Sequence, residues 1–207
     1  MIRTILARVL ILGSLASAVF ADGHDTMMVA WDGTPGYLES TIMGDTTSDG
    51  SQAHDVYMLE SNKVYLQLSE INLYTSCAIV GAPYGDGEHP ATIQPIGGSD
   101  GASQFTGWPQ NNFKTYGMHQ TYQFKNLLMN GVYADEIDAL FGVLATYGES
   151  NVIIVDHVTS VHHNIISYFN FGTAQRLHVT NCTAVQFTPY GGGMWWGGFL
   201  WGGGGGW

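Results

Sequence analysis

Phe124-Lys125-Asn126-Leu127-Leu128, Val155-Asp156-His157-Val158 and Val179-Thr180-Asn181-Cys182-Thr183 are three versions of one pattern, and they decide the expected fold. Each is a strand-like run that ends at an Asn or Asp and continues with a small or apolar residue. The anchors Asn126, Asp156 and Asn181 are 30 and 25 residues apart. A repeat of this length that contains strands alone is typical of a β-solenoid, in which each coil stacks on the one before.

The Asn and Asp anchors have a physical role in such a fold. The turn between two strands of a coil needs a residue in the left-handed conformation, which Asn tolerates. Stacked coils repeat that turn about every 4.8 Å, so the anchor side chains can form a hydrogen-bonded ladder. Phe124, Val155 and Val179 are then expected to point inward, one above another. A β-sandwich with chance Asn turns is the competing interpretation.

Short strands separated by turn residues fill most of the chain. They are rich in Val, Ile, Tyr and Phe, as strands usually are. We expect strands at Asp55–Leu59, Lys63–Leu68, Ala78–Val80, Ala91–Gln94, Tyr122–Leu128, Asn151–Val155, Ile165–Phe171, Leu177–Val179 and Ala184–Phe187. Helix signals are limited to Ala134–Leu144, which has acidic residues near its start, and to Gly36–Met43, which suits a cap over one open end.

Several of these segments resemble a known architecture. They are Gly36–Ile42, Gly44–Thr46, Asp55–Glu60, Val64–Leu66, Ala78–Ala82, Pro90–Ile93 and Val179–Thr183. Together they resemble the capping segment, the opening strands and the recurrent Asn-Cys-Thr coil of secreted proteins of the pectate-lyase-like superfamily. The resemblance spans residues 36–187 and is specific to architecture rather than activity. It implies an all-β, right-handed parallel β-helix, which we expect over residues 22–190.

Many proteins of that superfamily degrade or bind acidic polysaccharides, and many have no known activity. The resemblance implies a lyase chemistry in which a Lys or Arg is the base and a carboxylate-bound Ca²⁺ neutralises the uronate. Lys125 and Arg176, which lie beside ladder positions, are the candidate bases. Asp135, Glu136 and Asp138 are the candidate Ca²⁺ ligands. Scattered surface charge is the alternative for all five.

Histidines gather in one region of the chain. Asp156-His157 and His162-His163 form its densest titratable cluster. Adjacent residues of a strand point to opposite faces, so His162 and His163 cannot both serve one site from a regular strand. His157 and His163 are candidates for a general base or a metal ligand, and a polar outer face is the competing interpretation.

Two other features are expected to be structural. Gly97–Gly101 matches the G-x-S-x-G pattern of a nucleophile elbow, but Pro95 precedes it and no helical pattern follows, so we expect a surface loop. Cys77 and Cys182 are 105 residues apart in strand-like runs, where buried free thiols compete with the disulfide that export would permit.

The N-terminus predicts export. Arg3 and Arg8 lead into an apolar run, and Val19-Phe20-Ala21 suits a cleavage site. The run is shorter than the about 20 residues that cross a bilayer. Residues 1–21 are therefore expected to be a signal peptide. The mature chain is expected to be secreted, periplasmic or at the cell surface, with no membrane span.

The mature chain is strongly acidic. Loss of the signal peptide leaves four basic residues against 17 acidic ones, a formal charge of −13. This charge argues against nucleic acid and anionic membranes as partners, because both need basic patches.

Residues 191–207 form a low-complexity tail in which ten of 17 residues are Gly and four are Trp. Trp195 and Trp196 are candidate sugar-stacking residues. We expect neither a cap nor a regular coil here. The chain is therefore predicted to be the N-terminal portion of a longer β-helix, with an open end that self-associates end to end. A tail that docks over that end is the alternative.

Two functions remain open at this point. The first is an exported β-helix domain that binds glycan or serves as a surface scaffold, without complete catalytic machinery. The second is a polysaccharide lyase or glycoside hydrolase acting on acidic polysaccharide. The scarcity of basic residues favours the first, and the resemblance favours the second.

Export gives a first testable prediction. The exported protein should begin at Asp22 or within a few residues of it, because cleavage follows Ala21. N-terminal sequencing of the protein recovered outside the cytoplasm measures this. A mature cytoplasmic protein that retains Met1 would contradict it.

Overall fold

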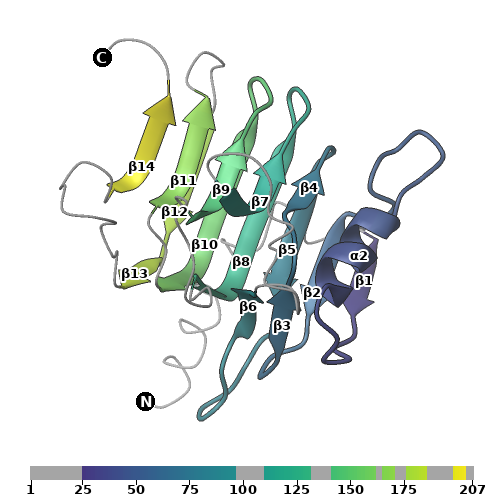
Figure 1. The fold of residues 1–207 in the computed structure, drawn as a ribbon, viewed down its shortest axis with the longest axis vertical. Helices are drawn as coiled ribbons and strands as arrows, with labels where there is room; N and C mark the ends of the chain where they lie inside the picture. The colour runs from purple at the N-terminus through teal and green to yellow at the C-terminus, as the bar shows by residue number, and fades with distance from the viewer. Residues whose placement is uncertain are drawn as a thin grey trace, which may run out of the picture.

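The computed structural model describes residues 25–96, 110–131, 141–161, 165–170, 176–185 and 198–203. Within them the chain forms fourteen β-strands and one α-helix, and every strand pair is parallel (Figure 1). The predicted all-β class with parallel strands is confirmed. The predicted signal peptide lies outside the described residues.

The larger sheet contains six strands in a row. Their order is β1 (Thr26–Val29), β2 (Val56–Leu59), β5 (Cys77–Gly81), β8 (Thr121–Asn130), β10 (Val152–Val161) and β12 (Arg176–Thr180). Three shorter strands form a second row, namely β3 (Val64–Gln67), β6 (Ala91–Pro95) and β13 (Thr183–Val185). β3 pairs with β6, β6 pairs with the second half of β8, and β13 pairs with the second half of β10. β8 and β10 therefore belong to both rows.

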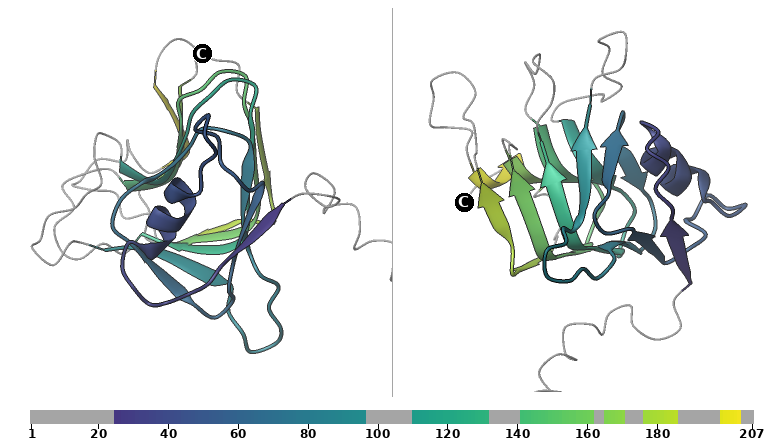
Figure 2. Two further views of the ribbon diagram at one scale, coloured as in Figure 1. Left: turned by 90° about the vertical axis from the view of Figure 1, so that its right-hand side faces the viewer. Right: turned by 90° about the horizontal axis from the view of Figure 1, so that it is seen from below.

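The second sheet contains five strands. Their order is β4 (Ile71–Leu73), β7 (Gln110–Thr115), β9 (Phe141–Thr146), β11 (Ile165–Asn170) and β14 (Gly198–Gly203). Along the chain, each of these strands follows strands of the larger sheet. The end-on view in Figure 2 shows the strands arranged around a common interior, with α2 (Tyr37–Gly44) at the near end.

The core is built by the alternation of side chains along the strands. Phe124 of β8 and Val155 of β10 are 2% and 8% exposed and pair in register. Val155 also pairs with Val179, so the predicted stack of three inward residues is confirmed. Phe113 of β7 packs on Phe124 with ring centroids 4.8 Å apart, which joins the two sheets. Full burial of such a side chain stabilises the fold by about 1.5–3 kcal/mol.

The helix covers the end of the core next to β1 (Figure 2). Leu38 and Ile42 of α2 are buried, as expected for the predicted cap at Gly36–Met43. Glu39 accepts hydrogen bonds from the backbone amides of Leu68 and Ser69, which fixes the helix on the turn after β3. The cap therefore combines apolar burial with a polar anchor.

Side chains also stack in the turns that follow the second sheet. Three tyrosines lie in consecutive turns with ring centroids 5.1 and 5.4 Å apart: Tyr74, Tyr116 and Tyr147. In the same turns Gln120 Oε1 accepts a hydrogen bond from Ser76 N, and Asn151 Oδ1 accepts one from Gln120 N. These contacts hold each turn against its neighbour.

Two sequence predictions are wrong in part. The helix expected at Ala134–Leu144 cannot include its last four residues, because they belong to β9, which pairs with β7 and β11. The tail is not irregular throughout, because Gly198–Gly203 form β14 beside β11. Ladder hydrogen bonds use the backbone, so a glycine-rich segment can extend a sheet when a neighbouring strand is in place.

Two smaller points concern the cysteines and the membrane. Cys77 is buried and Cys182 partly buried, and both are free thiols. Among the described residues, no helix combines the length and the apolar character needed to cross a membrane.

The close approach of β5 and β8 gives a second prediction. A Cβ added at Gly81 would lie 2.0 Å from the carbonyl oxygen of Asn126, so the two strands would have to separate. Gly81→Ala should lower the free energy of unfolding by about 2–3 kcal/mol. Gly44→Ala, at the end of α2, is the matched control, because a Cβ there has no atom within 4 Å and should leave stability nearly unchanged. Urea unfolding of both variants measures the difference, and equal stability would contradict the packing.

Candidate functional site

The side of β8, β10 and β12 that faces away from the core forms a polar surface. Register and alternation put nine residues on this outer face: Thr121, Gln123, Lys125, Val152, Ile154, Asp156, Arg176, His178 and Thr180. Lys125, Asp156 and Thr180 lie in one row across the three strands. The intervening residues, such as Phe124 and Val155, point into the core. We call this surface the outer β8–β10–β12 face.

Directly after its residue of this row, each of the three segments has one residue in the left-handed backbone conformation. Asn126, His157 and Asn181 have φ angles of 54°, 53° and 53°. Asn126 and Asn181 have the left-handed conformation expected of ladder residues, whereas in the middle strand His157, and not Asp156, has it. Asp156 pairs with Lys125 and Thr180, so His157 is the residue level with the two asparagines. Histidine is among the residues that tolerate this conformation, and the displaced Asp156 enters the row on the face.

Asp156 is the centre of the site. Its Oδ1 accepts hydrogen bonds from Thr180 Oγ1 at 2.7 Å and Asn181 Nδ2 at 3.0 Å. His157 Nδ1 lies 2.9 Å from the same oxygen, and Lys125 Nζ lies 3.7 Å from Oδ2. The Asp156 side chain is only 6% exposed. A carboxylate this buried is stable because it is surrounded by donors on both sides.

The environment lowers the pKa of Asp156. Burial alone would raise this pKa, but the hydrogen bonds from Thr180, Asn181 and His157 outweigh burial and hold the pKa at about 2. Asp156 is therefore a carboxylate at any pH near neutrality. It acts as a fixed acceptor that orients the groups around it.

His157 is the chemically accessible member of the cluster. Its side chain is 53% exposed, and the ionised Asp156 favours the tautomer in which Nδ1–H donates to the carboxylate. The other nitrogen, Nε2, is then free to accept a proton or a hydrogen bond. The structure thus brings together four of the residues singled out from sequence: Lys125, Asp156, His157 and Asn181.

Arg176 shares the outer face but lies at the other end of β12. It is level with Val152, whereas Thr180 is level with Asp156. Four residues along a strand correspond to about 13 Å, so Arg176 does not reach the Asp156 cluster. His178 lies between them on the same side of the strand and is exposed.

The remaining candidates lie outside the described residues. These are His163, Trp195, Trp196, Asp135, Glu136, Asp138 and the Gly97–Gly101 loop. Within the described residues there is no group of three or more His, Cys, Asp or Glu side chains placed to hold a metal ion. Sequence reasoning did not identify Thr180, although its place directly before Asn181 in the repeat was a usable signal.

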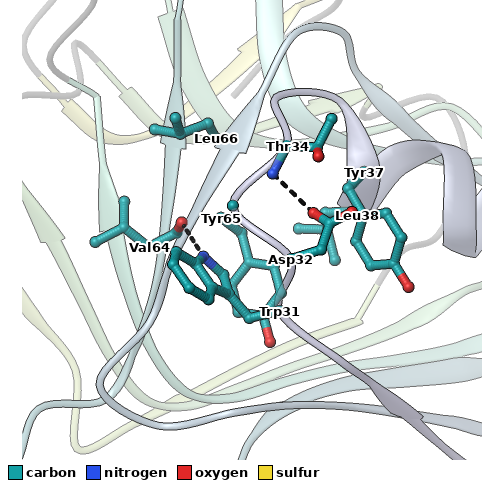
Figure 3. A pocket seen from close by; sticks show the side chains of 9 residues that line it. Trp31, Asp32, Thr34, Tyr37, Leu38, Val64, Tyr65 and Leu66 are labelled. Carbon is teal, nitrogen blue, oxygen red and sulfur yellow. Dashed lines mark hydrogen bonds between the residues drawn. The ribbon is translucent and has the colours of Figure 1, made fainter.

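A shallow depression lies at the cap, between the segment before α2 and β3 (Figure 3). Its most prominent residue is Trp31, whose indole Nε1 donates to the carbonyl of Val64 at 2.8 Å. Lys63 Nζ lies 4.6 Å from the centre of the Trp31 ring, and a Cβ on Gly33 would lie 3.4 Å from that ring. The ring is therefore occupied with protein contacts and covers the edge of β3, which is a structural role.

Comparisons of the chain with protein-family models, with curated proteins and with solved structures each returned no match.

The Asp156 cluster gives a third prediction, on stability and pH. The pKa of Asp156 in the folded protein is about 2, below its ordinary value of 3.8, so its stabilising effect is complete above pH 3.8 and is lost as the pH falls toward 2. Asp156→Asn should therefore lower the free energy of unfolding at pH 7 by about 1–3 kcal/mol. The difference from the unmodified protein should shrink as unfolding is measured at successively lower pH.

Asp86→Asn is the control for this experiment, since Asp86 is exposed on the loop between β5 and β6. It removes the same charge and should have little effect at any pH. If Asp156→Asn lowered the free energy of unfolding by the same amount at every pH, the charge of the carboxylate would not be what stabilises the cluster.

Proposed function

We propose that the chain is an exported right-handed parallel β-helix of the pectate-lyase-like kind, and that it binds polysaccharide along the outer β8–β10–β12 face. Parallel pairing of successive segments, the left-handed residues at the turns and the cap formed by α2 support the β-helix. The N-terminal sequence supports export.

The row of Lys125, Asp156 and Thr180 carries the binding proposal. It places an ammonium and a hydroxyl on either side of a buried carboxylate that fixes them, with the imidazole of His157 next to that carboxylate. Sugars are recognised by convergent polar groups of this kind, placed by a rigid scaffold. A row that crosses three parallel strands also suits an extended polymer better than a small molecule.

The distribution of charge supports a carboxylated glycan. The mature sequence has only four basic residues, and two of them, Lys125 and Arg176, lie on this face. Lys114, in contrast, is buried in an ion pair with Glu70 at 2.9 Å. Positive groups on an otherwise acidic protein favour an acidic ligand at that place.

The Asp156–His157 pair supports a second candidate, a polysaccharide lyase or hydrolase. A carboxylate that orients Nδ1 of a histidine leaves Nε2 available as a general base, which is what proton abstraction next to a uronate carboxylate requires. The observations favour binding, because Asp156 accepts hydrogen bonds from Thr180 and Asn181 and lies next to Lys125, so it fixes these groups on the face.

Binding to immobilised polysaccharides tests the proposal and is the fourth prediction. Immobilised pectin, alginate or a glycosaminoglycan should retain the full chain more strongly than an immobilised neutral glucan does. Arg176→Ala should weaken binding about tenfold, which corresponds to about 1.4 kcal/mol for one charge contact. Lys63→Ala, which removes the same charge beside Trp31 and away from the face, should bind like the unmodified protein.

The same samples separate the two candidates. His157→Asn keeps a residue that tolerates the left-handed conformation and removes the imidazole. Release of unsaturated sugars by the unmodified protein, lost in His157→Asn with binding retained, would favour the lyase. Absence of binding to every carboxylated polymer, or equal binding by Arg176→Ala, would contradict the proposed face.

A further inference from the structure

A histidine at the capped end lies between two carboxylates. His54 Nδ1 is 2.7 Å from Asp45 Oδ2, and His54 Nε2 is 3.9 Å from Asp25 Oδ2. Asp45 directly follows α2, and Asp25 directly precedes β1. Both ring nitrogens of one histidine therefore face acidic groups from two different elements. This arrangement favours the doubly protonated, positively charged ring.

The Asp45 carboxylate is held in place by the surrounding chain. Tyr57 of β2 donates its hydroxyl to Asp45 Oδ2 at 2.8 Å. The backbone nitrogen of Asp45 donates to Thr41 O in the last turn of α2, and Ala53 N donates to Asp45 O. The carboxylate thus has a fixed position from which it can hold His54, while Asp25, with a side chain 72% exposed, is the solvent-exposed partner.

We propose that His54 is a pH-sensitive latch that holds β1 against the rest of the cap. When the imidazole is protonated, it links Asp45 at the end of α2 to Asp25 at the start of β1. When it loses its proton, one of the two links is lost and β1 is held mainly by its ladder with β2. β1 pairs only with β2 among the described residues, so its release uncovers the edge of β2.

The direction of the pKa values agrees with this geometry. The hydrogen bond to Asp45, followed by the nearby charges of Asp45, Asp25 and Asp55, raises the pKa of His54 above 6.5 despite partial desolvation. The stabilisation is therefore complete below pH 6.5 and is lost as the pH rises through the raised value. Burial alone would raise the pKa of Asp45, but hydrogen bonds from His54 and Tyr57 lower it below 3.8, so that side of the latch weakens only in acid.

Tyr57 and Asp55 also lie near the ring, and Cys77 lies near Tyr57. Tyr57, whose ring lies 6.4 Å from the ring of His54, has its pKa raised by burial and by Asp45, so it remains a neutral donor. Cys77 of β5, which is close enough to Tyr57 to influence it electrostatically, has its pKa raised to about 12 by burial. Asp55 adds negative charge next to His54. His54 is thus the group of this cluster whose ordinary pKa lies near neutrality.

Hydrogen exchange of the full chain at pH 6 and pH 8.5 tests the latch and is the fifth prediction. Protection of the β1 amides is expressed relative to the β8 amides in the same sample, because that ratio cancels the effect of pH on the exchange chemistry. In the unmodified protein we expect the relative protection of β1 to fall about 2- to 5-fold at pH 8.5, since the ion pair that is lost involves an exposed carboxylate.

Three variants make the test decisive. His54→Gln should show the low protection at both pH values, and Asp25→Asn, a change at an exposed side chain, should reduce the pH effect without disturbing the core. His89→Gln, on the exposed loop between β5 and β6, should behave like the unmodified protein. A β1 protection that is equal at the two pH values, or a pH effect that survives in His54→Gln, would overturn the latch.

Discussion

Parallel strands that stay in register across a bend at a left-handed residue are the constraint on which the rest of the structure depends. Asn126 and His157 each have a positive φ inside a ten-residue strand, so β8 and β10 bend there, and their pairing skips this one position and resumes in register after it. Each strand then contributes to two rows of the sheet. Because the pairing is parallel and in register, side chains at paired positions of neighbouring strands point to the same face. This is why Phe124, Val155 and Val179 stack in the core. A slip of one residue would turn all of these side chains to the opposite face.

The same constraint creates the polar site. Lys125, Asp156 and Thr180 are 31 and 24 positions apart in sequence, yet register places them in one row. The bend next to the row adds Asn181 and His157, whose left-handed backbones direct their side chains back to Asp156. A buried carboxylate with several donors is a costly group to assemble unless the scaffold positions the donors in advance. The site is therefore a consequence of the repeat and does not need a separate loop.

The sequence predicts most of the strands of the larger sheet, together with the cap at α2, because hydrophobic alternation is a local signal. It misses β1 and β4, which are short, and it assigns the start of β9 to a helix. It does not predict β7, which reads Gln110-Asn111-Asn112-Phe113-Lys114-Thr115, or the glycine-rich β14, because their strand conformation depends on neighbours. The ladder was predicted from residue type, and that criterion selects Asp156 over His157. Only register reveals that the histidine occupies the bend. Lys125, Asp156, His157 and Asn181 could thus be named in advance, whereas the hydrogen bonds that unite them could not.

The two carboxylates at the centre of the polar clusters, Asp156 and Asp45, differ in the donors that surround them, and this difference separates a permanent contact from a variable one. Asp156 receives hydrogen bonds from the neutral side chains of Thr180 and Asn181, so most of its stabilisation persists whatever the charge of His157. Asp45 depends on one titratable ring, that of His54, and on one neutral phenol. Neutral donors suit the middle of the fold, where three strands must remain in register. A titratable donor is tolerable at the capped end, where its loss weakens the attachment of β1 alone. The placement of these donors implies that a change of pH near neutrality acts on the capped end while leaving the outer face intact.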